Sequence, residues 1–161
     1  MRYIKEVNNS DFTIIVDDRE KQPWDVGVVQ VKRLKVGDYS IEGYEDVIAI
    51  EKKSGIGELF NDLAASYRET FKRFLRKMEA HPVSCIIVGE ELNEYNIRRA
   101  LSIIRKKSKG RCQLTEGTIH HWVGEIMMTY GIPILFLDWR VRDDILPNVF
   151  KAAYKKAREI K

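Results

Sequence analysis

Two uninterrupted apolar runs constrain most strongly how this chain of 161 residues can fold. They are Val83–Val88 (VSCIIV) and Ile132–Leu137 (IPILFL), and neither shows the alternation of a strand that has one face in water. Segments with helical periodicity stand before, between and after them. Such strands are typical of the centre of an α/β sheet that helices cover on both faces. The sequence therefore predicts an α/β fold in which both runs are central strands.

The first third of the chain is rich in shorter strands. Thr13–Val16 is predicted as a buried strand, and Val28–Leu34 alternates in part and is a candidate second strand. Asp38–Ile41 and Val47–Ile50 flank Gly43, which indicates a hairpin. The sequence thus predicts a meander before the helical part begins.

The rest of the chain has helical spacing around the two apolar strands. Apolar residues between Leu59 and Met78 recur every three or four positions, which predicts one helix or two in series. Three further helices are predicted: Asn96–Arg105, Thr118–Tyr130, and a last helix through Ile160 that Asp143 caps, with Pro147 near its first turn. The alternation of strands and helices supports a mixed sheet flanked by helices.

Length and composition narrow the classes of protein. The chain has the length of about one domain, and we expect a single domain over residues 1–161. No run approaches the roughly 18 apolar residues of a membrane span, and the first residues (MRYIKEVNNSDF) lack the apolar region of a secretory signal. The two cysteines form no disulfide framework. An intracellular protein without membrane association is expected.

Charge is distributed unevenly along the chain. Residues 1–62 carry 9 basic and 13 acidic side chains, a net −4, whereas residues 63–161 carry 19 basic and 11 acidic, a net +8. This division suggests one part that attracts cations and another that attracts a polyanion.

Acidic side chains gather where the early strands end. Asp17 and Glu20 follow the first strand, Asp38 begins the hairpin, and Glu51 ends its second strand. Because side chains alternate along a strand, Glu51 and Lys53 share a face, and Asp38 can lie opposite Glu51 across the hairpin. Converging carboxylates repel one another unless a cation lies between them, and oxygen ligands favour Mg²⁺ or Mn²⁺. The pattern suits metal-assisted hydrolysis of a phosphodiester. Solvated turn residues are the alternative for any one of these acids.

Three motifs in order resemble a known family. They are VDDRE (Val16–Glu20), VGDYSI (Val36–Ile41) and IEKKS (Ile50–Ser54). Together they resemble the nuclease domain of the XPF family of structure-selective DNA endonucleases, whose signature is a GD pair, an ERK triplet and a later aspartate. The resemblance extends to the GIPILFLD segment and so covers nearly the whole chain. It implies a restriction-endonuclease-like core, a mixed central β-sheet flanked by α-helices, with no room for a helix–hairpin–helix or helicase domain.

The resemblance also implies roles for single residues. Asp38 and Glu51 resemble metal ligands for Mg²⁺ or Mn²⁺, with the carbonyl of Lys52 as a further ligand, and Lys53 resembles the catalytic lysine. Asp17 and Glu20 match the acids expected beside the metal. The further residue of the first motif, Arg19, is expected either to hold this acidic cluster together or to contact a phosphate.

This sequence departs from the family signature at two positions. Lys52 replaces the arginine of the triplet, which keeps the charge but loses the bidentate guanidinium. The later aspartate corresponds to Glu58 after one extra residue, so Glu58 either substitutes for it or caps a helix.

Basic residues in the second part suit a DNA backbone. Ile97–Arg111 contains seven basic and no acidic residues, and Arg68 matches an arginine that the family has at the head of its long helix. Such side chains bind phosphates without reading bases. The predicted nucleic-acid contacts are Arg19, Arg68, Arg98, Arg99, Lys106 and Lys107.

These observations predict a metal-dependent endonuclease for branched, flap or fork DNA, encoded by a prokaryote or a phage and either a stand-alone protein or a fragment. The resemblance also implies a homodimer through the C-terminal helices as one form of assembly. A catalytically silent DNA-binding or assembly module is the alternative, and cleavage of RNA or single strands by the same chemistry stays open.

Overall fold

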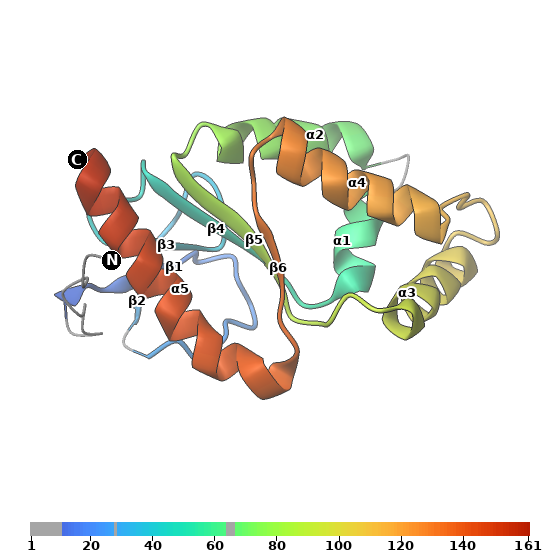
Figure 1. The fold of residues 1–161 in the computed structure, drawn as a ribbon, viewed down its shortest axis with the longest axis horizontal. Helices are drawn as coiled ribbons and strands as arrows, with labels where there is room; N and C mark the ends of the chain where they lie inside the picture. The colour runs from blue at the N-terminus through green and yellow to red at the C-terminus, as the bar shows by residue number, and fades with distance from the viewer. Residues whose placement is uncertain (1–10, 28, 64–66) are drawn as a thin grey trace, which may run out of the picture.

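The computed structural model of the chain describes residues 11–27, 29–63 and 67–161. In this part of the chain a six-stranded sheet has the order β2-β1-β3-β4-β5-β6 (Figure 1). The strands are β1 (Ile14–Val16), β2 (Val29–Val31), β3 (Tyr39–Ile41), β4 (Ile48–Lys53), β5 (Val83–Val88) and β6 (Ile134–Phe136). The helices are α1 (Ile56–Leu63), α2 (Arg68–Glu79), α3 (Glu94–Lys107), α4 (Glu116–Thr129) and α5 (Trp139–Ile160).

The sheet is mixed, as the sequence predicted. β3 is antiparallel to both β1 and β4, while the β1–β2, β4–β5 and β5–β6 pairs are parallel. The predicted hairpin is the β3–β4 pair, in which Tyr39 lies opposite Ile50. The two helices α1 and α2 connect the parallel strands β4 and β5, as a crossover connection requires.

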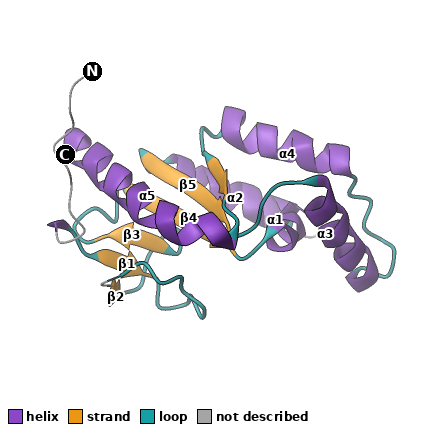
Figure 2. Ribbon diagram, turned by 60° about the horizontal axis from the view of Figure 1, so that its bottom comes forward, coloured by secondary structure: helices purple, strands orange, loops and turns teal. Residues whose placement is uncertain are grey.

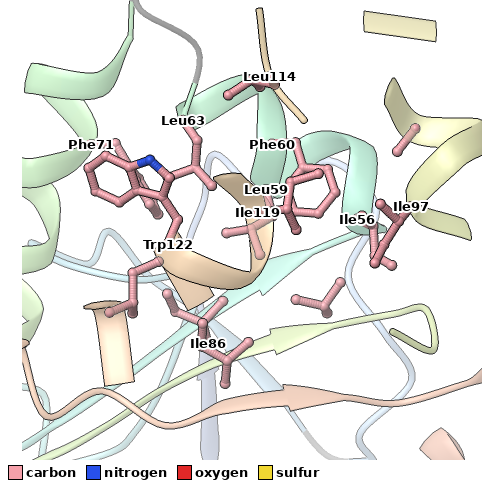
Figure 3. Close-up of a cluster of buried hydrophobic side chains, with 14 of the residues drawn as sticks. Ile56, Leu59, Phe60, Leu63, Phe71, Ile86, Ile97, Leu114, Ile119 and Trp122 are labelled. Atoms are coloured by element: carbon pink, nitrogen blue, oxygen red, sulfur yellow. The ribbon is translucent and has the colours of Figure 1, made fainter. Parts of the chain in front are cut away.

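Helices cover the sheet on two faces, because alternate residues of its strands enter two separate cores. Ile86 and Val88 of β5 pack with α1 to α4, while Ile87 packs with α5 and with Ile48 and Ile50 of β4. Figure 2 shows α5 running across the strands, and α1, α3 and α4 grouped beyond β5. Figure 3 shows the larger core, in which side chains of α1, α2 and α4 meet above β5.

The structure corrects two details of the prediction. β6 lies at an edge of the sheet instead of its centre, and its Leu135 and Phe136 are only half-buried. The last helix begins at Trp139 instead of near Asp143, because the carboxylate of Asp138 accepts the Arg140 N–H at 2.9 Å and caps it there. Pro147 therefore lies inside the helix.

None of the helices in the described ranges is long and apolar enough to cross a membrane.

Candidate active site

Three charged residues lie in succession in the last half of β4. The sequence predicted a strand ending at Ile50, but β4 continues through Lys53 because β5 pairs with it along this length. Side chains alternate, so Glu51 and Lys53 face α1 and α2, whereas Lys52 faces the opposite core. Each of the three residues is at most 9% exposed. Buried charges of this kind need partners, and the partners define the site.

Asp38 reaches this point from the neighbouring strand. The pairing of Tyr39 with Ile50 brings Asp38 opposite Glu51, as the hairpin spacing predicted. The Asp38 N–H donates to the Ile50 carbonyl at 2.9 Å, and Asp38 Oδ2 accepts the Lys52 N–H at 2.8 Å. Burial raises the pKa of Asp38, the Lys52 N–H opposes this shift, and the charge of Glu20 adds to it. The predicted convergence of Asp38 and Glu51 is thus present in the structure.

The glycine before Asp38 permits this close approach. Gly37 has φ +78°, and a Cβ atom on it would lie 2.9 Å from the Ile50 carbonyl oxygen. A larger residue would therefore meet both backbone strain and a backbone clash. The main chain before β3 passes directly against β4 at the residue that precedes Asp38. A glycine is needed at that position, which accounts for the order Gly37-Asp38.

Lys53 lies between two carboxylates. Its Nζ atom is 2.9 Å from Glu51 Oε1 and 2.8 Å from Asp62 Oδ2, which α1 supplies. Burial alone would lower the pKa of Lys53, but the attraction of Glu51 and Asp62 raises it above its usual value. Burial raises the pKa of Glu51 to about 7, while Lys53 opposes that shift. The ammonium group therefore stays charged at neutral pH, and Glu51 titrates there.

The donor set at this point fits a hard divalent cation. Asp38 and Glu51 carry carboxylates at facing positions of β3 and β4, and the charge of Asp38 contributes to the raised pKa of Glu51. The main chain of Lys52 adjoins Asp38. Among the described residues, no group of three His, Cys, Asp or Glu side chains could hold a metal ion. Two carboxylates, a carbonyl and water suit Mg²⁺ or Mn²⁺, since Mg²⁺ keeps several waters when it is bound.

Asp17 is committed to holding the loop that follows β1. Its carboxylate accepts the Arg19 N–H at 2.9 Å, the Arg19 Nε at 2.6 Å and the Leu34 N–H at 2.7 Å. Burial would raise the pKa of Asp17, but the hydrogen bonds from Arg19 and Leu34 lower it below its usual value. Arg19 thus binds Asp17 of the acidic cluster and donates to the Leu34 carbonyl at 3.0 Å, while contact with a phosphate stays a prediction. The guanidinium is also about half exposed.

Glu20 and Lys52 form a second ion pair beside the site. Lys52 Nζ lies 3.2 Å from Glu20 Oε1 and donates to the Gln22 carbonyl at 2.7 Å. The same ammonium group lies 5.5 Å from the ring centroid of Trp24, and Arg142 of α5 lies 5.4 Å from that centroid. A lysine in place of the family's arginine therefore has a full set of partners in this chain.

Glu58 acts at the start of α1, apart from the proposed metal ligands. Its carboxylate accepts the Ser54 N–H at 2.7 Å, which is the capping arrangement that the sequence left open. Glu90 holds the same end of the helix by accepting the Ile56 N–H at 2.9 Å, and Arg99 pairs with Glu90. Two acids therefore fix the N-terminus of α1, where they also match the helix dipole.

Arg68 lies close to the site at the beginning of α2. Its guanidinium is 5.4 Å from the ring centroid of Trp122 in α4, and Lys72 lies 5.5 Å from the same centroid. Phe71, between them on α2, has its ring centroid 5.9 Å from Lys53 Nζ. Figure 3 shows Phe71 beside Trp122 in the core. One turn of α2 thus carries the ring that contacts Lys53 and the two basic side chains of Arg68 and Lys72.

The predicted basic segment divides into paired and unpaired residues. Arg98 pairs with Glu94 and with Glu116, and Arg99 pairs with Glu90, so acids already balance both charges. Five exposed residues of the segment form no ion pair with any described residue. Arg105 donates to the Leu114 carbonyl at 3.0 Å, and we call the other four the basic loop: Lys106, Lys107, Lys109 and Arg111.

An open groove adjoins the basic loop. It has a volume of about 810 Å³ and lies between α3 and the start of α4. Arg98, Ser102, Arg105 and Lys106 line the α3 side. Leu101 on this side and Thr115, Glu116 and Gly117 on the α4 side complete the lining, so basic side chains border a groove that also has apolar surface.

Sequence reasoning missed two residues of this constellation. Asp62 lies nine positions after Lys53, and Glu90 lies just after β5; neither belongs to one of the three motifs. In the sequence, Asp62 stands out only as a polar residue within an apolar helical pattern. That pattern does not identify a contact with Lys53. The packing of α1 against β4 creates this contact.

Comparisons with known proteins agree with the fold. The model of the family described as ERCC4 domain matches residues 7–140. XPF from Aeropyrum pernix has a TM-score of 0.59 at 17% identity, over 88% of this chain and 61% of that one. XPF from Aeropyrum pernix in complex with DNA has a TM-score of 0.61 at 16% identity, over 90% of this chain and 66% of that one.

The chain therefore spans about three fifths of the length of the first of these structures. No curated protein matches it. The family match covers most of the sequence and agrees with the motifs, the mixed sheet and its flanking helices. The chain belongs to the ERCC4 domain family, and it has the restriction-endonuclease-like fold of an XPF nuclease domain.

Proposed function

We propose that the protein is a divalent-metal-dependent DNA endonuclease that hydrolyses phosphodiester bonds. The observation that carries this proposal is the convergence of Asp38 and Glu51 beside the buried ammonium group of Lys53. The two carboxylates attract a metal cation, and the ammonium group beside them adds a fixed positive charge. This combination suits hydrolysis of a phosphodiester bond, which joins anionic nucleotides. A structural role alone gives no reason to bury this set of charges together.

In this proposal Asp38, Glu51 and the carbonyl of Lys52 hold Mg²⁺ or Mn²⁺. When bound, the ion supplies an activated water and offsets charge on the scissile phosphate. Lys53 keeps its proton because its pKa is raised, which favours stabilisation of negative charge in the transition state over action as a base. Glu20 and Asp17 support the site through Lys52 and Arg19.

The basic side chains provide a route for the DNA backbone. We propose that Arg68 contacts the substrate beside the site and that the basic loop binds phosphates farther along α3. Arg98 and Arg99 remain proposed contacts, although each must exchange an acidic partner for a phosphate. XPF from Aeropyrum pernix has been solved in complex with DNA, which supports DNA as the ligand of this fold. Branched, flap or fork DNA is the proposed substrate.

A homodimer is part of the proposal. The edge strand β6 is flanked by exposed apolar side chains on the two helices next to it in the sequence: Met127 and Met128 of α4, and Trp139, Val141 and Ile145 of α5. Exposed apolar side chains beside an unpaired strand edge favour association with a second copy. Light scattering coupled to size exclusion tests this, with twice the chain mass expected.

Cleavage assays test the endonuclease proposal. Labelled flap, fork and duplex DNA are incubated with the protein in Mg²⁺ or Mn²⁺, beside Asp38→Ala, Lys53→Ala and a sample with EDTA. The proposal expects cleavage of branched substrates by the wild type and loss of cleavage in the three controls. Binding without cleavage of any substrate would support the catalytically silent module instead. Preferred cleavage of RNA or single strands would overturn the proposed substrate class.

A further inference from the structure

Asp62 of α1 is a second carboxylate that binds Lys53, in addition to Glu51 of β4. The two distances to Lys53 Nζ are nearly equal, 2.8 Å to Asp62 Oδ2 and 2.9 Å to Glu51 Oε1. Asp62 Oδ2 is shielded from solvent, and Lys53 is 7% exposed. The Asp62 side chain is 30% exposed, but the oxygen that faces Lys53 is shielded, so water competes little for the ammonium group at this contact.

The two partners of Lys53 differ in what else they can bind. Glu51 adjoins Asp38 at the proposed metal site, whereas Asp62 extends from a helix. A carboxylate that binds a divalent cation has less negative charge to offer an ammonium group, and the two cations repel each other. When Glu51 binds metal, Lys53 therefore needs a second anchor or moves away from the site.

The second anchor is firmly placed. Leu59 and Leu63, on either side of Asp62 in the sequence, are fully buried in the core that α1 shares with α2 and α4 (Figure 3). The N-terminus of the same helix is held by Glu58 and Glu90. Asp62 cannot follow Glu51 toward a metal without moving this packed helix.

We propose that Asp62 is a positioning residue that keeps the Lys53 ammonium group beside the site while Glu51 binds the metal ion. This inference rests on the proposed function for the metal, but the Asp62–Lys53 contact exists independently of it. Asp62 touches neither substrate nor metal in this account, and it acts through Lys53.

The ammonium protons of Lys53 report on this anchor without DNA. In ¹H–¹⁵N spectra of the side-chain ammonium groups, a Lys53 held by an ion pair exchanges slowly and gives a signal. Glu51→Gln imitates the loss of Glu51 to a metal, and the signal should persist because Asp62 remains. Asp62→Asn alone should keep the signal through Glu51, whereas Asp62→Asn combined with Glu51→Gln should broaden or abolish it. Glu79→Gln is the matched control, since it removes an exposed acid from α2, and its spectrum should equal that of the wild type.

Loss of the signal in Glu51→Gln, or its persistence in the double variant, would overturn the inference. Backbone amide spectra recorded on the same samples show whether each variant is folded. In the Glu51→Gln background, Asp62→Glu keeps the charge and should retain the signal even if the double variant with Asp62→Asn fails to fold. Its loss in a folded Glu51→Gln/Asp62→Glu protein would also contradict the proposal.

Kinetics separates this inference from the proposed function. Asp62→Asn should lower kcat about 10- to 100-fold with little change in the KM for DNA, as loss of an outer partner of a catalytic group does. Asp62→Glu should recover part of kcat. A lower affinity for DNA at unchanged kcat would contradict the inference. If the wild type cleaves nothing, the proposed function fails, while the spectra still decide the role of Asp62.

Discussion

At the residue scale, burial gives the two neighbouring lysines different roles. Lys52 and Lys53 are adjacent in sequence, yet alternation along β4 sends them into opposite cores. Lys52 binds Glu20 and the Gln22 carbonyl and thereby ties the loop after β1 to the sheet. Lys53 binds two carboxylates at the end where Asp38 enters. In the proposed mechanism, the charge that serves the chemistry is the one on Lys53, on the same face as Glu51.

If Glu51 binds the metal as proposed, metal binding should depend on pH. Its pKa is raised to about 7 by burial, so the carboxyl group is mainly protonated at pH 6 and mainly ionised at pH 8. A cation binds the ionised form, so Mn²⁺ affinity should fall about tenfold for each unit of pH below 7 and level off above it. Titration calorimetry at a series of pH values measures this. An affinity that stays constant between pH 5 and pH 8 would contradict the assignment of Glu51, and Glu51→Gln should remove the dependence.

At the element scale, the junction of β3 and β4 places Asp38. Two glycines flank β3 and have the same φ of +78°, but they differ in their surroundings. Gly37 faces the Ile50 carbonyl, whereas a Cβ atom on Gly43 would meet nothing within 4 Å. A side chain at Gly43 would therefore cause backbone strain alone, whereas a side chain at Gly37 would cause the same strain and a clash with β4.

Alanine substitutions at these glycines should differ in their effects. Gly43→Ala should lower the free energy of unfolding by about 1 kcal/mol through strain alone. Gly37→Ala adds a clash with the main chain of β4 and should lower it by about 2–4 kcal/mol. Urea denaturation measures both. Because the clash displaces Asp38, Gly37→Ala should also weaken Mn²⁺ binding, and Gly43→Ala should not. Equal effects on stability would show that the close approach is unimportant.

The elements also show what the sequence can predict and what it cannot. Alternation, helical periodicity and the Gly-Asp and Glu-Lys-Lys motifs identified the β3–β4 hairpin and the face shared by Glu51 and Lys53. The edge position of β6 was not predictable, because an apolar run looks the same at the centre of a sheet and at an edge that another surface covers. The contact between Asp62 and Lys53 depends on how α1 packs, which no local pattern records.

At the scale of the whole molecule, acids and bases occupy different regions. Residues 1–62, with a net charge of −4, include the carboxylates around β4. Residues 63–161, with a net charge of +8, include the basic loop. Ion pairs reduce the number of basic side chains that are ready to bind a polyanion, since acids hold Arg98 and Arg99. Within the described segment 97–111, the basic side chains that are free of such pairs lie at the end of α3 and directly after it.

Salt dependence of DNA binding distinguishes these groups. Replacing Lys106 and Lys107 by glutamine should weaken binding to any DNA sequence and reduce the slope of log affinity against log salt by about 2. Replacing Arg98 and Arg99 by glutamine should reduce it less, because their charges are already balanced. Fluorescence anisotropy between low and moderate salt measures both slopes. A larger loss for the arginine pair would place the DNA over the start of α3.

The central claim is that Asp38, Glu51 and Lys53 form a hydrolytic site for DNA. Its most direct test is the single-turnover rate of DNA cleavage in Mn²⁺ by the wild type and by Lys53→Met, at protein concentrations that saturate the substrate. Lys53→Met removes the charge and retains most of the side chain's volume. The rate should fall about 100- to 1,000-fold while DNA binding is unchanged. Cleavage at an equal rate by both proteins, or no cleavage by the wild type, would contradict the claim.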